Sequence, residues 1–179
     1  MRLFLGIDLP DKIKDYLFNL QSGLKNSSLA KVAWESKYKF HITLKFLGDV
    51  PDEKIINLKN KLKNIKLNKF KLKLTNIGYF PGVSKINVIW VGVAPENQVT
   101  ELQKLIDYET LELGSVKLGS PHITLGRVKF IRHRKGLVDH LNNMNVENLN
   151  FNADYFTLYK STLTKDGSVY DALERYDLL

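Results

Sequence analysis

Two copies of one tetrapeptide carry the residues of this sequence that are best suited to chemistry. His41-Ile42-Thr43-Leu44 lies in the first half of the chain, and His122-Ile123-Thr124-Leu125 begins 81 residues later. Side chains two apart on a β-strand point to the same side, so each histidine shares a face with its threonine. The isoleucine and leucine of each copy then face the interior and hold the strand in place.

Such a pair of motifs suits the hydrolysis of a phosphate ester. One group must take a proton from the attacking water and another must give a proton to the departing oxygen, and histidine titrates near neutral pH. Threonine hydroxyls can donate hydrogen bonds to the non-bridging oxygens, where negative charge has to be held. We therefore expect His41 and His122 to be catalytic, and Thr43 and Thr124 to bind the substrate phosphate.

Two other interpretations of these histidines compete with catalysis. A lone histidine on a strand is more often a partly buried residue with a satisfied hydrogen bond. The repeated context argues against this here, because two of only four histidines begin the same tetrapeptide. A zinc site is the second alternative, but no further ligand accompanies either motif, so we expect no metal site. His133 and His140 lack such a context and are expected at the surface.

Basic and aromatic residues near the motifs are harder to interpret. Arg127 suits bidentate phosphate binding, but strict alternation puts it on the wrong face unless a bulge near Gly126 re-aims it. Lys45 has the same parity as His41, although it could equally be a solvated strand residue. Phe46 and Tyr79 could stack on an RNA base, but we favour core positions for both. The lysines from Lys59 to Lys73 indicate a solvated helix face followed by a solvated strand face.

Hydrophobic periodicity predicts alternating strands and helices around the motifs. The expected strands cover Arg2 to Asp8, Val32 to Trp34, Phe40 to Leu47, Phe70 to Ile77, Ile86 to Val93, Pro121 to Val128, Phe151 to Leu163 and Val169 to Tyr176. The expected helices contain Ile13 to Leu24, Ile55 to Ile65, Glu96 to Leu113 and Leu137 to Met144, with a loop at Gly78 to Ser84 and a hairpin turn at Lys165-Asp166-Gly167.

This order predicts an α+β fold in which a strand, a helix and a His-Ile-Thr-Leu strand occur once in each half. We expect one bilobal domain over residues 1–179, with a pseudo-two-fold axis relating two mainly antiparallel sheets that are flanked by helices and separated by a central cleft.

Composition narrows the function classes. The chain has 179 residues, 44% of them hydrophobic, which is enough for a continuous core. It has no cysteine, which excludes disulfides and thiolate metal sites, and no apolar stretch long enough for a membrane span is found. The net charge of +8 favours polyanionic partners such as nucleic acid, although lysine also serves solubility. We expect a cytoplasmic monomer without a cofactor, since no phosphate-binding glycine loop is present.

The motifs and their flanks resemble a known family. The sequence is similar to the two-histidine phosphoesterases, specifically the bacterial and archaeal RNA 2′,3′-cyclic phosphodiesterases, also called 2′-5′ RNA ligases. The resemblance rests on Met1 to Pro10, His41 to Gly48, Gly78 to Pro81, Ile89 to Val93, Pro121 to Leu125 with Arg127, and Leu158 to Ser161 with Gly167 and Tyr170.

The resemblance implies a bilobal LigT-like fold and the conversion of an RNA 2′,3′-cyclic phosphate into a 2′-phosphomonoester. It makes His41 the proton donor to the leaving 3′ oxygen and His122 the proton acceptor from water. Thr43, Thr124 and Arg127 become phosphate ligands, and RNA ends, including tRNA fragments, become the partners. Two alternatives stay open: reversible 2′-5′ joining of tRNA halves, and binding of RNA ends without catalysis.

Overall fold

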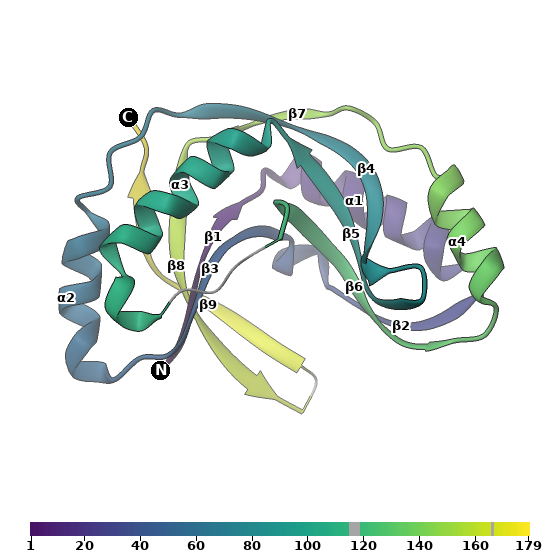
Figure 1. The fold of residues 1–179 in the computed structure, drawn as a ribbon, viewed down its shortest axis with the longest axis horizontal. Helices are drawn as coiled ribbons and strands as arrows, with labels where there is room; N and C mark the ends of the chain where they lie inside the picture. The colour runs from purple at the N-terminus through teal and green to yellow at the C-terminus, as the bar shows by residue number, and fades with distance from the viewer. Residues whose placement is uncertain (115–118, 166) are drawn as a thin grey trace.

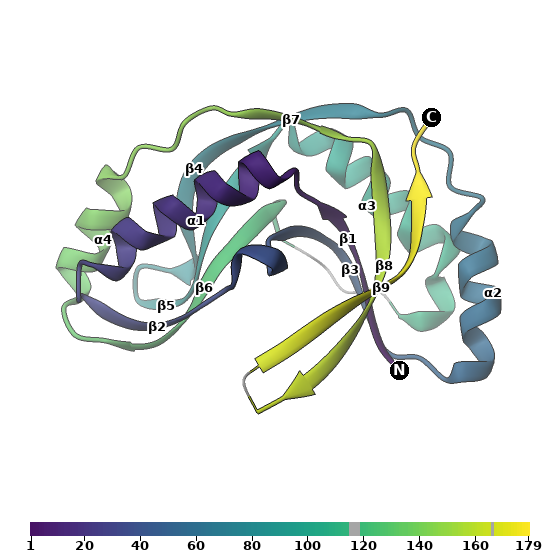
Figure 2. The same ribbon diagram turned by 180° about the vertical axis from the view of Figure 1, so that it is seen from behind.

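The computed structural model describes residues 1–114, 119–165 and 167–179 (Figures 1 and 2). The described residues form nine strands, four α-helices and two short 3₁₀ helices. In chain order these are β1 (Arg2–Asp8), α1 (Asp11–Lys25), β2 (Ala30–Trp34), η1 (Lys37–Lys39), β3 (His41–Asp49), α2 (Asp52–Leu62), β4 (Phe70–Gly82), β5 (Lys85–Ala94), α3 (Glu96–Glu109), η2 (Leu111–Leu113), β6 (His122–Ile131), α4 (Arg134–Asn143), β7 (Asn150–Ala153), β8 (Tyr155–Thr164) and β9 (Gly167–Asp177).

The strands pair in the order β7-β4-β5-β6-β3-β1-β8-β9, with β2 also on β6, and each pairing between described strands is antiparallel. The expected α+β architecture with mainly antiparallel sheets is confirmed. The two sheets that the sequence predicts meet at the centre, where β3 and β6 share the single pair Ile42–Ile123. That pair joins the two halves into one strongly curled sheet.

Two of the helices, α1 and α3, each pack on the half of the sheet opposite to the strand that they follow in the chain. Helix α1 follows β1, yet it contacts β6 in the other half through the side chain of Gln21, which donates to the main-chain oxygen of Leu125. Helix α3 follows β5 and packs on β3, where its Asp107 pairs with Lys45. Figure 1 shows α2 and α3 on one half, and α1 and α4 on the other. Each half is therefore covered by a helix that follows a strand of the opposite half.

The apolar face of each helix explains this packing. In α1 the inward residues Ile13, Leu17 and Leu24 are at most 4% exposed, and in α3 Val99, Leu102 and Ile106 are fully buried. These positions recur at the three- and four-residue spacing of one helical face. They belong to a single cluster of buried side chains that includes Ile42 and Ile123 from the central strands, as well as residues of both halves. The motif strands are thus fixed from behind by the core.

Two expected elements differ from the structure. Residues 78–82 are not in a loop, because β4 continues through Gly82 and pairs with β5. Gly78 is needed there because the ring of Trp90 occupies the place that a Cβ atom at this position would take. The expected strand from Phe151 to Leu163 is interrupted at Asp154, since β7 pairs with β4 while β8 pairs with β1 in the other half.

The remaining boundaries differ by a few residues. The expected helix from Glu96 to Leu113 ends at Glu109, and η2 follows it. Helix α4 begins three residues earlier than expected, because the His133 ring caps it by accepting a hydrogen bond from the Gly136 amide. The expected turn at Lys165-Asp166-Gly167 includes Asp166, which lies outside the described residues. None of the helices in the described part of the chain is long and apolar enough to cross a membrane.

Candidate active site

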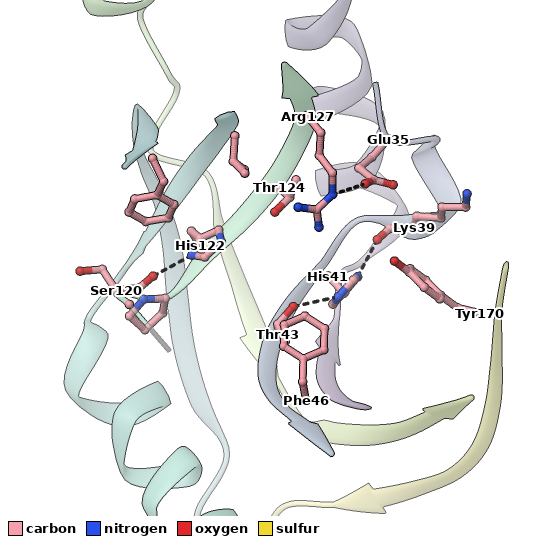
Figure 3. Close-up of a pocket in the computed structure, with 14 residues that line it drawn as sticks. Glu35, Lys39, His41, Thr43, Phe46, Ser120, His122, Thr124, Arg127 and Tyr170 are labelled. Carbon is pink, nitrogen blue, oxygen red and sulfur yellow. Dashed lines mark hydrogen bonds and ion pairs between the residues drawn. The ribbon is translucent and has the colours of Figure 1, made fainter. Parts of the chain in front are cut away.

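The central strands bring the two tetrapeptides together. Ile42 on β3 and Ile123 on β6 face each other at the junction and are fully buried. Because alternate side chains of a strand point to opposite sides, the histidines and threonines of both motifs emerge on the other face. All four line one cavity of about 180 Å³, together with Arg127 (Figure 3).

Both imidazoles are held in the same way. The Nδ1 atom of His41 lies 2.6 Å from the main-chain oxygen of Lys39, and Nδ1 of His122 lies 2.8 Å from that of Ser120. A carbonyl oxygen can only accept a hydrogen bond, so Nδ1 carries the proton in each ring. In the neutral form, Nε2 is therefore the atom that can accept a proton. In His41 this atom lies 3.0 Å from the Thr43 hydroxyl.

The His41 ring lies in an aromatic environment. The ring of Phe4 lies 5.0 Å from it, and that of Tyr170 stands edge-on at 5.6 Å. Burial lowers the pKa of His41, while the carbonyl of Lys39 and the carboxylate of Asp8 act in the opposite direction. Because burial is the largest influence, His41 is neutral at pH 7 when no anion is bound.

The His122 ring has a comparable setting in the second half. The ring of Phe80 stands 4.9 Å from it, and that of Trp90 lies at 5.8 Å. Burial lowers the pKa of His122, the carbonyl of Ser120 acts against this, and the guanidinium of Arg127 lowers the pKa further. Among the charged groups, Asp8 favours the protonated form of His41 while His122 and Lys14 oppose it, and Arg127 favours the neutral form of His122.

A β-bulge at the fourth position of each motif changes which of the next side chains reach the cavity. In β3, Thr43 pairs with Gly6 and Lys45 with Leu5, which leaves Leu44 as an extra residue. In β6, Thr124 pairs with Trp90 and Gly126 with Ile89, which leaves Leu125 as the extra residue. An extra residue shifts the alternation of the strand by one position. The residue five positions after each histidine then faces the cavity.

Arg127 is brought to the cavity by the bulge in β6. Its Nε lies 3.9 Å from a carboxylate oxygen of Glu35, and its side chain is 57% exposed (Figure 3). A buried amide supports this geometry, because Gln21 Nε2 donates to the main-chain oxygens of Glu35 and Leu125, each at 2.8 Å. From the sequence, Arg127 could reach the cavity only if a bulge near Gly126 re-aimed its side chain. The structure contains this bulge.

The bulge in β3 turns Lys45 away from the cavity. The two positions expected for Lys45, on the face of His41 or in solvent, are therefore both wrong. Lys45 does not share the face of His41, and it is only 1% exposed rather than solvated. Its ammonium lies 2.8 Å from a carboxylate oxygen of Asp107 and 3.4 Å from the main-chain oxygen of Thr110, both in or next to α3. The shifted alternation places Lys45 under the helix and brings Phe46 to the cavity instead.

The sequence favoured core positions for Phe46 and Tyr79. This is wrong for Phe46, whereas Tyr79 lies at the edge of the core. Phe46 is 44% exposed and lines the cavity, as Phe80 does. Tyr79 is half-buried and packs against the core. Phe46 therefore adds an aromatic ring to the cavity that the two histidines line.

The other residues singled out from the sequence lie elsewhere. His133 is exposed and caps α4, while His140 is half-buried rather than at the surface. Three lysines of the Lys59 to Lys73 run pair with carboxylates, with Lys59 and Lys63 both 3.2 Å from Glu174. The run is therefore a solvated face, as expected, and three of its lysines also form ion pairs, which the sequence did not predict.

Three residues of the site carried no chemical signal in the sequence. Glu35, Lys39 and Tyr170 line the cavity, from the segment after β2, from η1 and from β9 respectively. In the sequence, only the family resemblance points to Tyr170. Glu35 reaches the site because its amide donates to the oxygen of Leu125, which extends the β2–β6 pairing past the bulge.

Within residues 1–114, 119–165 and 167–179, no three histidines or acidic residues are grouped so that they could hold a metal ion. His41 and His122 therefore have no third ligand in the described part of the chain. The chemistry that the cavity offers on its own is proton transfer beside donors for an anion.

Comparison with known proteins places the chain in a family. Two successive segments, residues 7–90 and 91–170, match the model of the LigT like phosphoesterases. The chain belongs to this family. The resemblance inferred from the motifs is thereby confirmed, and each of the two matching segments contains one of the tetrapeptides.

Relatives match over nearly the whole length. The chain is 39% identical over 179 residues to the RNA 2′,3′-cyclic phosphodiesterase of Methanocaldococcus jannaschii, covering 98% of this chain and 100% of the relative. A crystal structure of a Thermus thermophilus protein superposes with a TM-score of 0.78 at 25% identity, over 99% and 97% of the two chains. The apo crystal structure of Escherichia coli LigT gives 0.77 at 25% identity, over 99% and 96%.

Proposed function

We propose that this protein opens the 2′,3′-cyclic phosphate at the 3′ end of RNA to give a 2′-phosphomonoester, without a metal ion. The observation that carries the proposal is the pair of imidazoles that are tethered through Nδ1 and line one cavity beside two hydroxyls and a guanidinium. The substrate is supported by the full-length relatives that carry the name RNA 2′,3′-cyclic phosphodiesterase.

The reaction requires two proton transfers at one phosphorus atom. A water molecule attacks the phosphorus opposite the 3′ oxygen, and His122 Nε2 takes one of its protons as the new P–O bond forms. The P–O3′ bond breaks, and His41 Nε2 gives a proton to the departing oxygen. The product is a 3′ hydroxyl beside a 2′-phosphate. The two rings exchange protonation states in each turnover and return to the starting state by exchange with solvent.

Burial is the largest influence on both rings and lowers the pKa of each; beyond burial, the carboxylate beside His41 and the guanidinium beside His122 favour this assignment of acid and base. Asp8 favours the protonated form of His41, and Arg127 disfavours the protonated form of His122. Lys14 holds the Asp8 carboxylate at 2.7 Å and weakens its influence, so the preference is modest. Binding of the anionic phosphate favours a proton on His41, because opposite charges then lie close together.

Three side chains hold the phosphate in this scheme. The hydroxyls of Thr43 and Thr124 donate to its non-bridging oxygens, where negative charge grows as phosphorus becomes five-coordinate. Arg127 contributes a guanidinium, whose planar donors match two phosphate oxygens. The exposed ring of Phe46 offers a stacking surface for the terminal base, as single-stranded RNA is often held.

The test is to incubate the purified protein with an RNA that ends in a cyclic phosphate, in the presence of a metal chelator, and to identify the product. Formation of a 2′-phosphate supports the proposal. His41→Ala and His122→Ala should each lower the rate by about two to four orders of magnitude. His133→Ala, which removes a histidine outside the cavity, serves as the matched control and should leave the rate unchanged.

Other outcomes point to other functions. Tight binding of the cyclic end without turnover would identify an RNA-end binding protein, and a joined 2′-5′ product would identify a ligase. Full activity in both histidine variants would reject the mechanism. Thr43→Val and Thr124→Val should each cost about ten- to a thousand-fold in rate, as for the loss of an oxyanion donor.

A further inference from the structure

A second cavity adjoins the candidate active site beneath the hairpin of β8 and β9. We call it the hairpin groove and define it by Arg2, Phe46, Ser161, Ser168 and Tyr170. It has a volume of about 380 Å³ and shares Phe46, Tyr170 and Arg127 with the catalytic cavity. The two spaces therefore meet along a common wall.

The sizes of the two cavities indicate how an RNA end would be divided between them. Sites for small organic ligands typically measure roughly 300–1,000 Å³. The catalytic cavity, at about 180 Å³, is below this range and suits a phosphate group and little more. An RNA chain that places its terminal phosphate there has to extend into adjoining space. The hairpin groove reaches the size that a further nucleotide portion requires.

The hairpin groove has the chemistry of an anion site. The Arg2 side chain is exposed, and no carboxylate among the described residues forms an ion pair with it. The hydroxyls of Ser161 and Ser168 lie on the two strands of the hairpin, and none of the described residues that line the groove is acidic. Tyr170 lines both cavities, and burial and Glu35 raise the pKa of its phenol while the cations Arg127 and Arg2 lower it.

The hairpin forms one wall of this groove. Strand β1 pairs with β8 only from Thr157 to Lys160, so Ser161 and the residues after it extend beyond the sheet. Figure 2 shows the hairpin projecting from the sheet. Near its tip, Gly167 lies beside the ammonium of Lys39, at 3.9 Å from the position of an added Cβ. The hairpin therefore turns toward η1, where the segment leading to His41 begins.

Resting on the proposed function, we propose that the hairpin groove binds the phosphodiester that precedes the terminal nucleoside of the RNA. Arg2 pairs with this phosphodiester, and the hydroxyls of Ser161 and Ser168 donate to its oxygens. The terminal nucleoside then spans the wall shared by the two cavities. The protein consequently prefers an oligonucleotide with a cyclic end over a mononucleotide 2′,3′-cyclic phosphate, which has no such linkage.

The test compares kcat/KM for three substrates. They are a mononucleotide 2′,3′-cyclic phosphate, a dinucleotide with the same cyclic end, and that dinucleotide with an uncharged methylphosphonate linkage. The natural dinucleotide should exceed the other two by roughly ten- to a hundred-fold, as expected for a charge-assisted contact. Arg2→Ala should remove most of this advantage and leave the mononucleotide rate within about two-fold, while Arg2→Lys should retain part of it.

The matched control is Lys71→Ala, which removes an exposed cation from β4 outside both cavities. It should leave the ratio between substrates unchanged. The dependence of dinucleotide KM on salt gives a second readout, because losing one phosphate contact lowers the logarithmic slope by about 0.7 for single strands.

Two results would overturn the inference: an unchanged substrate ratio in Arg2→Ala, or equal rates for the charged and uncharged dinucleotides. Failure of the proposed function has a different signature, since none of the three substrates would then be opened. Binding of the two dinucleotides, followed by fluorescence anisotropy, would still decide the inference in that case. Arg2→Ala must then weaken binding of the charged dinucleotide alone.

Discussion

Replacing Glu35 by glutamine should increase the affinity of the site for phosphates. Its carboxylate lies 3.9 Å from Arg127 Nε, so it competes with a bound phosphate for the guanidinium. It also repels any anion in the cavity that it lines. A cyclic phosphate carries one negative charge, whereas a phosphomonoester carries about 1.5 to 2 at pH 7. The repulsion is therefore stronger for the product, and Glu35 aids its release.

The geometry gives the size of the effect. Two unit charges 3.9 Å apart interact by about 1 kcal/mol in surroundings like water and by about 4 kcal/mol in a less polar setting. The Arg127 side chain is 57% exposed, so the lower value applies. One kcal/mol corresponds to about five-fold in affinity. Glu35→Gln should therefore lower KM about five-fold and lower the inhibition constant of the product by more than that.

The assay is steady-state hydrolysis of a cyclic-phosphate substrate, with the 2′-phosphomonoester added as inhibitor at pH values of about 7.5 and 5.5. The difference between substrate and product should shrink at the lower pH, because the product then carries mainly one charge. Glu101→Gln, which makes the same change at an exposed position of α3, is the control and should change neither constant.

Weaker binding of substrate and product in Glu35→Gln would refute this reasoning. It would mean that the carboxylate holds Arg127 in its binding position rather than competing for it. An unchanged inhibition constant would likewise exclude Glu35 from product release.

Three further predictions concern stability. Asp107→Asn leaves the buried Lys45 ammonium without its carboxylate and should lower the unfolding free energy by about 3 kcal/mol. Lys45→Met should cost less, because it leaves no buried charge unpaired, and urea titration compares the two variants. Gln21→Leu removes two hydrogen bonds to main-chain carbonyls and should cost about 1–3 kcal/mol, together with a lower kcat/KM from a loosened β6 bulge. Burial lowers the pKa of both His41 and His122 below 6.5, so the unfolded chain binds more protons in mildly acidic solution. Stability should therefore fall as the pH drops from about 6.5 toward the folded-state pKa values, and thermal melting of either His→Gln variant should show a shallower dependence.

The central part of the site could be predicted from the sequence because it depends on local rules. Alternation along a strand puts each histidine beside its threonine, and the repeat indicates that the two strands meet. The helices followed from three- and four-residue spacing. These features need only neighbouring residues, and the structure has them where they were expected, within a few residues.

The rest depends on contacts between distant segments. The bulges at Leu44 and Leu125 change which side chains reach the cavity, and no local pattern marks them, so simple alternation places Lys45 and Phe46 on the wrong faces. Glu35 contributes through pairing between β2 and β6, which is set by the fold rather than by neighbours in the chain. The sequence does not predict the interruption at Asp154, because both flanking segments have ordinary strand composition.

The exchange of helices between the two halves bears on how the chain could be divided. A polypeptide cut within residues 94–96 would separate α1 from β6, which it contacts through Gln21, and β3 from α3, which packs on it. Either fragment alone would present apolar surface to water. Mixed together, the two fragments should regain activity only as a pair, because each carries a helix that the other needs to cover its strands.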